Sequence, residues 1–156
     1  MSKSLARVRA ALDAAGVTAT VLEMPGGTRT ALEAAAAAGC HLDQIAKSII
    51  FRGEVSGHIR LFLTAGGHQV CAAKASALAA EPLGKADADL IRAETGFAIG
   101  GVAPVGHLTP SPAWIDPRLM DFATVWAAAG TPRHIFAISP TTLHRITGAA
   151  LADFVL

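Results

Sequence analysis

Glycine and proline divide this chain into short segments, and this division limits the fold more than any other feature of the sequence. Fifteen glycines and eight prolines are spread over 156 residues. Together with histidines and charged residues, they interrupt every apolar run well before the roughly 20 residues that a membrane-spanning helix needs. We therefore expect short helices and strands joined by tight turns, and no association with a membrane.

Composition narrows the class of protein further. Alanine supplies 34 residues, so the 52% hydrophobic share consists mainly of small side chains. Thirteen Lys and Arg against twelve Asp and Glu leave a net charge of +1, which excludes a highly charged protein that coats nucleic acid. Arg7 and Arg9 interrupt the apolar core that a signal peptide would need. We expect one domain over residues 1–156 and a cytoplasmic location.

Helical segments are marked by their apolar spacing and by their end signals. Thr30 and Ser139 precede two of them as capping residues, and Glu33 completes a capping-box pattern with Thr30. Glycines follow the last turn in each case. The expected helices span residues 4–15, 31–38, 87–95 and 140–146.

Strand-like runs outnumber the helices. Three consecutive runs, separated by glycine turns, indicate an antiparallel meander. Helices and strands are interleaved without a regular βαβ order. The sequence therefore predicts an α+β fold with a mixed, strongly curved or barrel-like sheet flanked by helices. The expected strands span residues 18–24, 46–52, 58–64, 68–73, 113–116, 122–128 and 134–138.

Lys47 is the first candidate functional residue, because it interrupts a run that otherwise reads as a buried strand. A buried ammonium is costly unless an anion or an open cavity mouth is close by, so this position suits an anionic ligand. A lysine on the solvent face of an edge strand is the alternative. Cys40 and Cys71 have no metal-ligand spacing and are expected to be free thiols, and the scattered histidines predict no metal site.

The segment 96–107 is the second candidate. Its glycines do not follow a dinucleotide-binding or P-loop spacing, but they would let backbone groups approach a ligand closely. A tight connection between a helix and a strand is the alternative. The third candidate, residues 127–134, contains Gly130 and ends in an Arg-His pair. A lone histidine beside an arginine is more often a surface residue than a catalyst, and a place for His134 in the pocket is the alternative. No catalytic triad can be assembled from these residues.

Three segments in this order, residues 30–35, 44–51 and 100–106, resemble the YbaK/ProX family of aminoacyl-tRNA deacylases. This editing domain is also found inserted in bacterial prolyl-tRNA synthetases, and the resemblance extends from about residue 5 to residue 148. The family implies a curved mixed sheet flanked by helices and hydrolysis of the ester between a wrongly attached amino acid and the 3′ end of tRNA. It implies no cofactor.

The resemblance also implies roles for individual residues. Lys47 is expected to engage the terminal phosphate and sugar, while the backbone of Gly100 and Gly101 orients the substrate and the attacking water. Catalysis would depend on the ribose hydroxyl of the substrate instead of a protein base. Alanines at 127–129 replace a hydroxyl residue of some relatives, which argues against a cysteinyl-tRNA preference, and Ser48 stands where others have Asn. The residues expected to bind substrate are Thr30, Ser48, Val102, Ala103, Pro104, Gly130 and His134.

These expectations combine into one hypothesis and two alternatives. The protein is expected to be a trans-editing deacylase for a small amino acid, such as alanine or serine, on tRNA-Pro. Its expected partners are the tRNA acceptor end and prolyl-tRNA synthetase, and it would act as a monomer or small homo-oligomer. A non-catalytic module that binds an aminoacyl-tRNA end, a nucleotide or a synthetase is one alternative. A hydrolase of small-molecule esters is the other.

Overall fold

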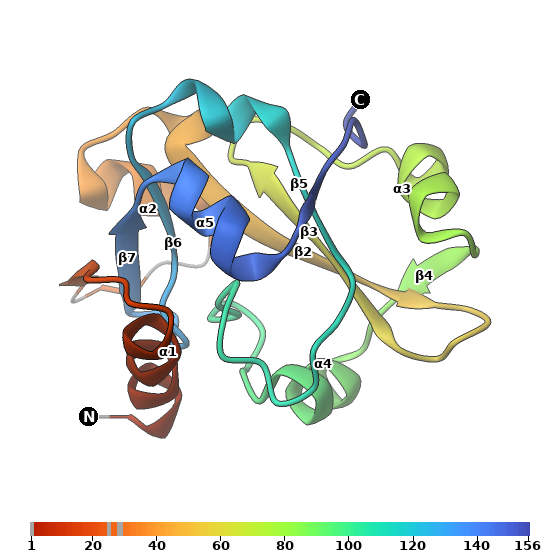
Figure 1. Ribbon diagram of the computed structural model, residues 1–156, viewed down its shortest axis with the longest axis horizontal. Coiled ribbons are helices and arrows are strands. Elements are labelled where there is room, and N and C mark those ends of the chain that lie inside the picture. The colour runs from red at the N-terminus through yellow and green to blue at the C-terminus, as the bar shows by residue number, and fades with distance from the viewer. Residues whose placement is uncertain (1, 25, 28–29) are drawn as a thin grey trace.

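A computed structural model describes residues 2–24, 26–27 and 30–156 of the chain. It contains five α-helices and two 3₁₀ helices along one mixed sheet (Figure 1). Within the described residues, no helix is both long and apolar enough to cross a membrane. The helices are α1 (Lys3–Ala14), α2 (Ala31–Ala38), η1 (Leu42–Gln44), α3 (Ala72–Ala79), α4 (Ala88–Thr95), η2 (Pro117–Asp121) and α5 (Pro140–Thr147).

The sheet has eight strands in the order β1-β7-β6-β2-β3-β5-β8, and β4 pairs separately with β2. The pairs β2–β6, β3–β5 and β5–β8 are parallel and the other pairs are antiparallel. The predicted α+β class with a mixed sheet is therefore confirmed. The strands are β1 (Thr20–Glu23), β2 (Ile45–Gly53), β3 (Ile59–Ala65), β4 (Leu83–Lys85), β5 (Ala113–Ile115), β6 (Val125–Ala128), β7 (His134–Ile138) and β8 (Ala150–Leu151).

The central strand β2 is paired along one edge and only at its ends along the other. On the first edge, residues 46–52 pair with β3. On the second edge, residues 45–46 pair with β6 and residues 51–53 pair with β4. Among the described strands, residues 47–50 of β2 thus have no partner on this second edge, which we call the open edge.

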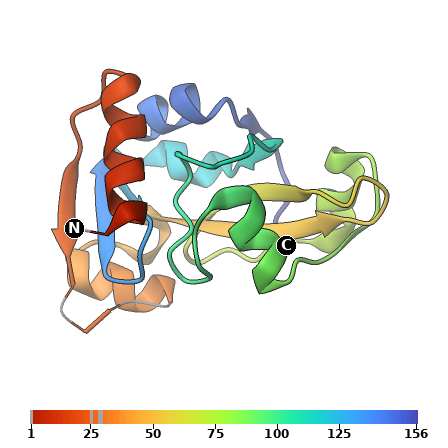
Figure 2. The ribbon, with the colours of Figure 1, turned by 90° about the horizontal axis from the view of Figure 1, so that it is seen from below.

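Helices cover both faces of the sheet beside β6. Val8 and Leu12 of α1 belong to the main core together with Phe136 of β7. Ala34 and Ala35 of α2 pack with Trp126 of β6 instead. Phe136 is paired with Ala127, so their side chains lie on the same face of the sheet. Trp126 precedes Ala127 in β6, and its ring therefore projects from the opposite face. Figure 2 shows α1 and α2 at the same end of the molecule.

The predicted helix caps are confirmed. The Thr30 side chain accepts a hydrogen bond from the Glu33 N–H at 3.1 Å, and the Ser139 side chain accepts one from the Thr142 N–H at 3.1 Å. Gly39 ends α2 in the left-handed conformation. These caps were predictable because each involves residues within one turn of each other.

The predicted strand at residues 68–73 is wrong. Val70 forms only an isolated bridge with Val155, and the chain enters α3 at Ala72. Alanines dominate the sequence from 72 to 80, and alanine has the highest helix propensity. The short elements η1, η2, β4 and β8 were not predicted, because two or three residues of strand or a short 3₁₀ helix carry no periodic signal.

Candidate functional site

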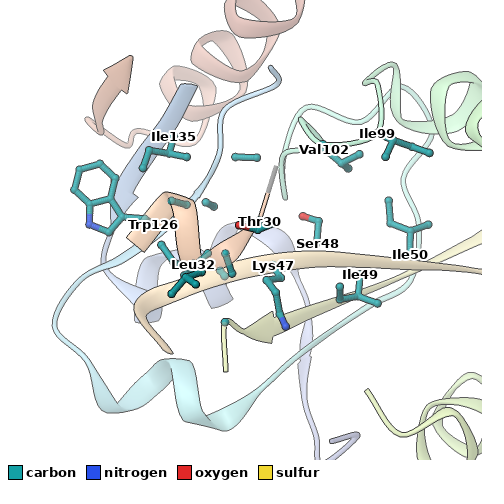
Figure 3. Close-up of a pocket in the computed structure, with 18 of the residues that line it drawn as sticks. Thr30, Leu32, Lys47, Ser48, Ile49, Ile50, Ile99, Val102, Trp126 and Ile135 are labelled. Carbon is teal, nitrogen blue, oxygen red and sulfur yellow. The ribbon is translucent and has the colours of Figure 1, made fainter. Parts of the chain in front are cut away.

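A cavity of about 780 Å³ lies against the open edge of β2 (Figure 3). Six consecutive residues of the strand, 45–50, line it. Because successive side chains point to opposite faces of a strand, a cavity that touches all six meets the strand at its edge. Most of the other lining residues come from the start of α2, from residues 96–107, which we call the glycine-rich loop, and from β6 and β7, and single residues of η1, α4 and the turn after β3 complete the lining. They are Thr30, Ala31, Leu32, Ala34, Leu42, Gly66, Ile91, Ile99, Gly100, Val102, Trp126, Ala127, Ala128 and Ile135.

Ser48 places a polar atom in this apolar lining. Its Oγ is buried and has no hydrogen-bond partner in the described part of the chain. In Figure 3 the Oγ points to the side of the strand on which Val102 lies. Buried hydroxyl groups are nearly always hydrogen-bonded, so an unpartnered one beside a cavity indicates a position for a polar ligand group.

Lys47 projects from the opposite side of the strand (Figure 3). Its Nζ donates a hydrogen bond to the backbone oxygen of His68 at 2.6 Å. Burial lowers the pKa of Lys47, and the carboxylates of Asp116 and Asp43 offset this only in part. The ammonium is therefore held at a place that disfavours its charge, which is a common property of functional lysines.

The turn that carries the acceptor of Lys47 is fixed by two aspartates. Asp116 Oδ2 lies 2.7 Å from His68 Nδ1 and accepts the N–H of Ala65 at 3.1 Å. Asp43 accepts the N–H of Gly67 at 2.8 Å. Burial acts to raise the pKa of Asp43, but hydrogen bonds from Arg118 and Gly67 outweigh it and leave the pKa below its ordinary value. Both aspartates thus restrain the turn and, through the His68 oxygen, the position of Lys47.

The glycine-rich loop is anchored to α1 by Arg7. The Arg7 Nε donates to the Gly106 oxygen at 2.8 Å, and Nη2 donates to the Thr95 oxygen at 3.3 Å. The guanidinium also lies 4.4 Å from the ring centre of Phe97. One side chain thus joins both ends of the loop that brings Gly100 and Val102 to the cavity.

His107 holds the far half of the same loop. Its Nε2 lies 2.6 Å from the Ala103 oxygen, so it donates a hydrogen bond there. Burial lowers the pKa of His107, the bond to Ala103 acts in the other direction, and the charge of Arg7 adds to the lowering. The neutral ring is therefore favoured in this apolar setting.

Five of the predicted site residues meet in the cavity, and they come from three separate segments of the chain. They are Thr30, Lys47, Ser48, Gly100 and Val102.

The other five predicted residues do not line this cavity. Gly101 packs on Thr131, whose backbone would lie 2.8 Å from a Cβ at this glycine. Gly130 has φ +97° and packs similarly on the oxygen of Ser4 in α1. Ala103 is fully buried, and Pro104 lines a separate cavity of about 260 Å³ between α1 and α5. His134 Nδ1 lies 2.7 Å from Thr131 Oγ1. These residues shape the loops behind the cavity.

Several lining residues were not expected from the sequence. Leu32 on α2 and Ile99 on the loop are 69% and 60% exposed although they line the cavity. Trp126 and Ile135 form the wall at β6 and β7. Single exposed apolar residues are common on protein surfaces, so nothing in the sequence distinguished Leu32 or Ile99. The contacts of Arg7 depend on residues about 90 to 100 positions away and were equally invisible.

The lining limits the chemistry that protein side chains can perform. Lys47 is the one charged residue of the lining within the described chain, and the lining contains no Asp, Glu or His. No group of three or more His, Cys, Asp or Glu side chains among the described residues could hold a metal ion. The arrangement suits a ligand that has a small apolar group and a polar group near the open edge, and that supplies its own reacting groups.

Several known proteins are similar to this chain in sequence and fold. A family model described as an aminoacyl-tRNA editing domain matches residues 26–146. A solved structure provisionally described as a trans-editing enzyme for prolyl-tRNA synthetase is 46% identical, with a TM-score of 0.93 over 100% of this chain and 99% of that one. The structure of hypothetical protein APE2540 is 29% identical, with a TM-score of 0.87 over 96% and 99% of the two chains. Uncharacterized protein YwhH of Bacillus subtilis is 29% identical over 79% of this chain and 78% of its own length.

Proposed function

Because this chain belongs to the aminoacyl-tRNA editing domain family, the YbaK/ProX family, we propose that it is a trans-editing hydrolase. Its substrate would be a tRNA, tRNA-Pro in the first instance, that carries a wrongly attached small amino acid such as alanine or serine. The observation that supports this most is the convergence of Thr30, Ser48 and Gly100 on one cavity at the open edge. The solved relative described for prolyl-tRNA synthetase supports the choice of tRNA.

The reaction is hydrolysis of an ester. The oxygen of water adds to the ester carbonyl carbon, and the bond from that carbon to the ribose oxygen breaks. The amino acid leaves as a carboxylate, and the ribose recovers its hydroxyl. Because the described lining has no carboxylate or imidazole, the neighbouring hydroxyl of the substrate ribose positions the water, accepts a proton from it and passes its own proton to the departing ribose oxygen. The second proton of the water is released to solvent when the carboxylic acid ionises. The backbone at Gly100 orients the reacting groups.

Lys47 would bind the phosphate of the terminal nucleotide. Its ammonium now donates to the His68 oxygen, so the side chain would exchange this acceptor for a phosphate oxygen when substrate binds. An anionic partner is favourable here, because burial without one works against the charge.

The apolar walls would select the amino acid by size. One methylene in an apolar pocket is worth only ~1–3 kcal/mol, so a synthetase confuses small amino acids and a second hydrolytic site is useful. Ala127, Ala128 and Ile135 provide small and medium side chains beside the open edge. These walls would contact the small side chain of alanine or serine.

A deacylation assay tests this proposal. Wild-type protein is incubated with alanyl-, seryl-, cysteinyl- and prolyl-tRNA-Pro, and so are the Lys47→Ala and Lys74→Ala variants. Lys74 is the matched control, because it is exposed and pairs with Asp153 far from the cavity. We expect alanyl- or seryl-tRNA to be cleaved by wild type and Lys74→Ala, and at least 10-fold more slowly by Lys47→Ala. Equal activity of both variants would remove Lys47 from the site, and no cleavage by wild type would exclude a deacylase that acts on these tRNA-Pro esters.

Binding without catalysis is the second candidate function. It is favoured by the lack of an acid or base in the described lining. In that case the protein would hold the aminoacyl end, or join prolyl-tRNA synthetase, without turnover. Protection of the ester from spontaneous hydrolysis in the same assay would identify this role.

A further inference from the structure

The open edge of β2 presents main-chain groups to the cavity, and their direction follows from the hydrogen bonds of β3. The Leu61 N–H donates to the Pro112 oxygen at 3.1 Å, and the Leu63 oxygen accepts the Asp116 N–H at 2.9 Å. Leu61 and Leu63 therefore direct their polar groups away from β2, while Phe62 between them and Thr64 direct theirs toward it.

The register of the β2–β3 pair extends this assignment to β2. Phe62 lies opposite Ile49, and Thr64 lies opposite Lys47. Ile49 and Lys47 thus hydrogen-bond to β3, and the alternate residues Ser48 and Ile50 direct their N–H and C=O groups the other way. That direction is the open edge, where neither β6 nor β4 pairs with them.

The open edge is too short for an added β-strand. It has four residues, 47–50, or about 13 Å at about 3.3 Å per residue. β6 bounds it at residue 46 and β4 bounds it at residue 51. An extended peptide longer than a few residues would meet one of these strands. The edge therefore suits a ligand with the main-chain groups of a single amino acid.

Ser48 is the edge residue best placed for such a ligand. Its main-chain groups face the gap, and its buried Oγ has no hydrogen-bond partner among the described residues. In an antiparallel ladder, one residue exchanges both of its hydrogen bonds with a single residue opposite. An aminoacyl group has the same donor and acceptor, namely its α-amino group and its ester carbonyl oxygen.

We propose that the main chain of Ser48 binds the aminoacyl ester as if it were a residue of the missing strand. The Ser48 carbonyl accepts a hydrogen bond from the free α-ammonium group, and the Ser48 N–H donates one to the ester carbonyl. This rests on the proposed function and restricts it to substrates with an unblocked α-amino group. N-acylated esters, which include peptidyl-tRNA, would be rejected, because the acyl group removes the charge and occupies the gap.

The first test compares three esters on the same tRNA: alanyl, lactyl and N-acetylalanyl. The lactyl ester is the control for size, because it replaces the ammonium with a hydroxyl of similar volume. Each enzymatic rate is divided by the spontaneous hydrolysis rate of the same ester, because the ammonium itself activates the ester. A hydrogen bond to a charged group is strong enough that we expect kcat/KM for the lactyl ester to fall at least about 10-fold, and for the N-acetyl ester to fall further.

The outcomes separate this inference from the proposed function. Alanyl and lactyl esters cleaved with equal normalised kcat/KM would overturn the role of the α-ammonium and leave the deacylase intact. Failure to cleave both the alanyl ester and the seryl ester of the same tRNA would overturn both. Equal cleavage of the N-acetyl ester would show that the gap is not closed to blocked amino acids.

A second test uses variants of Ser48. Ser48→Pro removes the N–H that faces the gap, and proline is tolerated on unpaired strand edges. Ser48→Ala is the matched control, because it removes only the hydroxyl. We expect both variants to fold and Ser48→Pro to have the lower kcat/KM. Equal activity of the two variants, or unfolding of Ser48→Pro alone in a thermal melt, would count against an unpaired, substrate-binding N–H.

Discussion

Lys47 carries its charge where burial works against it. At a pH below this lowered pKa, Lys47 is charged in both the folded and the unfolded protein. The charge is buried only in the folded protein, so its burial lowers the stability of the fold. Lys47→Met keeps the apolar stem and removes this cost together with the hydrogen bond to His68. We expect the Tm of the variant to equal or exceed that of wild type while deacylation is lost.

Thermal melts of Lys47→Met and the surface control Lys74→Met measure this effect. A Tm that falls by many degrees in Lys47→Met alone would show that the lysine is structural. Among the candidate site residues, Lys47 was also the easiest to select from the sequence, since a charged residue in an apolar run is visible without any long-range information. Gly130 and His134 show the opposite case, because whether they face a cavity or a neighbouring loop depends on the packing of α1 and Thr131.

The glycine-rich loop depends on α1 for its position. Arg7→Ala removes two hydrogen bonds and the contact with Phe97, and leaves the Gly106 and Thr95 oxygens without this donor. We expect a loss of about 1–3 kcal/mol in the free energy of unfolding, with a lower kcat/KM because Gly100 and Val102 move. Urea denaturation and the deacylation assay measure both effects. Arg9→Ala on the exposed side of the same helix is the control, and equal effects of the two variants would contradict the anchoring role.

His107 makes the stability of this loop dependent on pH. Its folded-state pKa lies below the ordinary value of 6.5, so the unfolded state binds the proton more readily. Its contribution to stability is complete above that value and is lost as pH falls toward the folded-state pKa. His107→Gln can still donate to the Ala103 oxygen but cannot be protonated. Urea denaturation from pH 8 to pH 5 should show a smaller acid loss in the variant, and parallel curves would refute this role.

Element prediction succeeded where the signals were local and failed where pairing was distant. The capped helices α2 and α5 needed only residues within one turn. The open edge of β2 could not be predicted, because it exists only where β6 stops and the three-residue strand β4 begins. The strand–turn–strand pair β2–β3 was visible in the sequence, yet the gap beside it, which defines the cavity, was not.

At the scale of the whole molecule, the net charge of +1 limits how tRNA can be held. Each phosphate contact contributes a slope of about −0.7 to −0.9 to the plot of log binding constant against log salt. A nearly neutral protein whose described cavity lining has one charged residue should make few such contacts, all near the acceptor end. In tRNA binding, the whole chain would thus depend on shape and backbone groups more than on electrostatic attraction.

A salt titration of tRNA binding tests this expectation. We expect a slope no steeper than about −3, and Lys47→Ala should reduce its magnitude by about one phosphate contact. Lys74→Ala should leave it unchanged, because Lys74 pairs with Asp153 on the surface and away from the cavity. A slope that indicates six or more contacts would show that the protein binds the body of the tRNA.

A few phosphate contacts give weak binding. Delivery of the tRNA by a partner such as prolyl-tRNA synthetase would therefore raise the rate of editing at low tRNA concentration. The same deacylation assay, with the synthetase added, measures this rate.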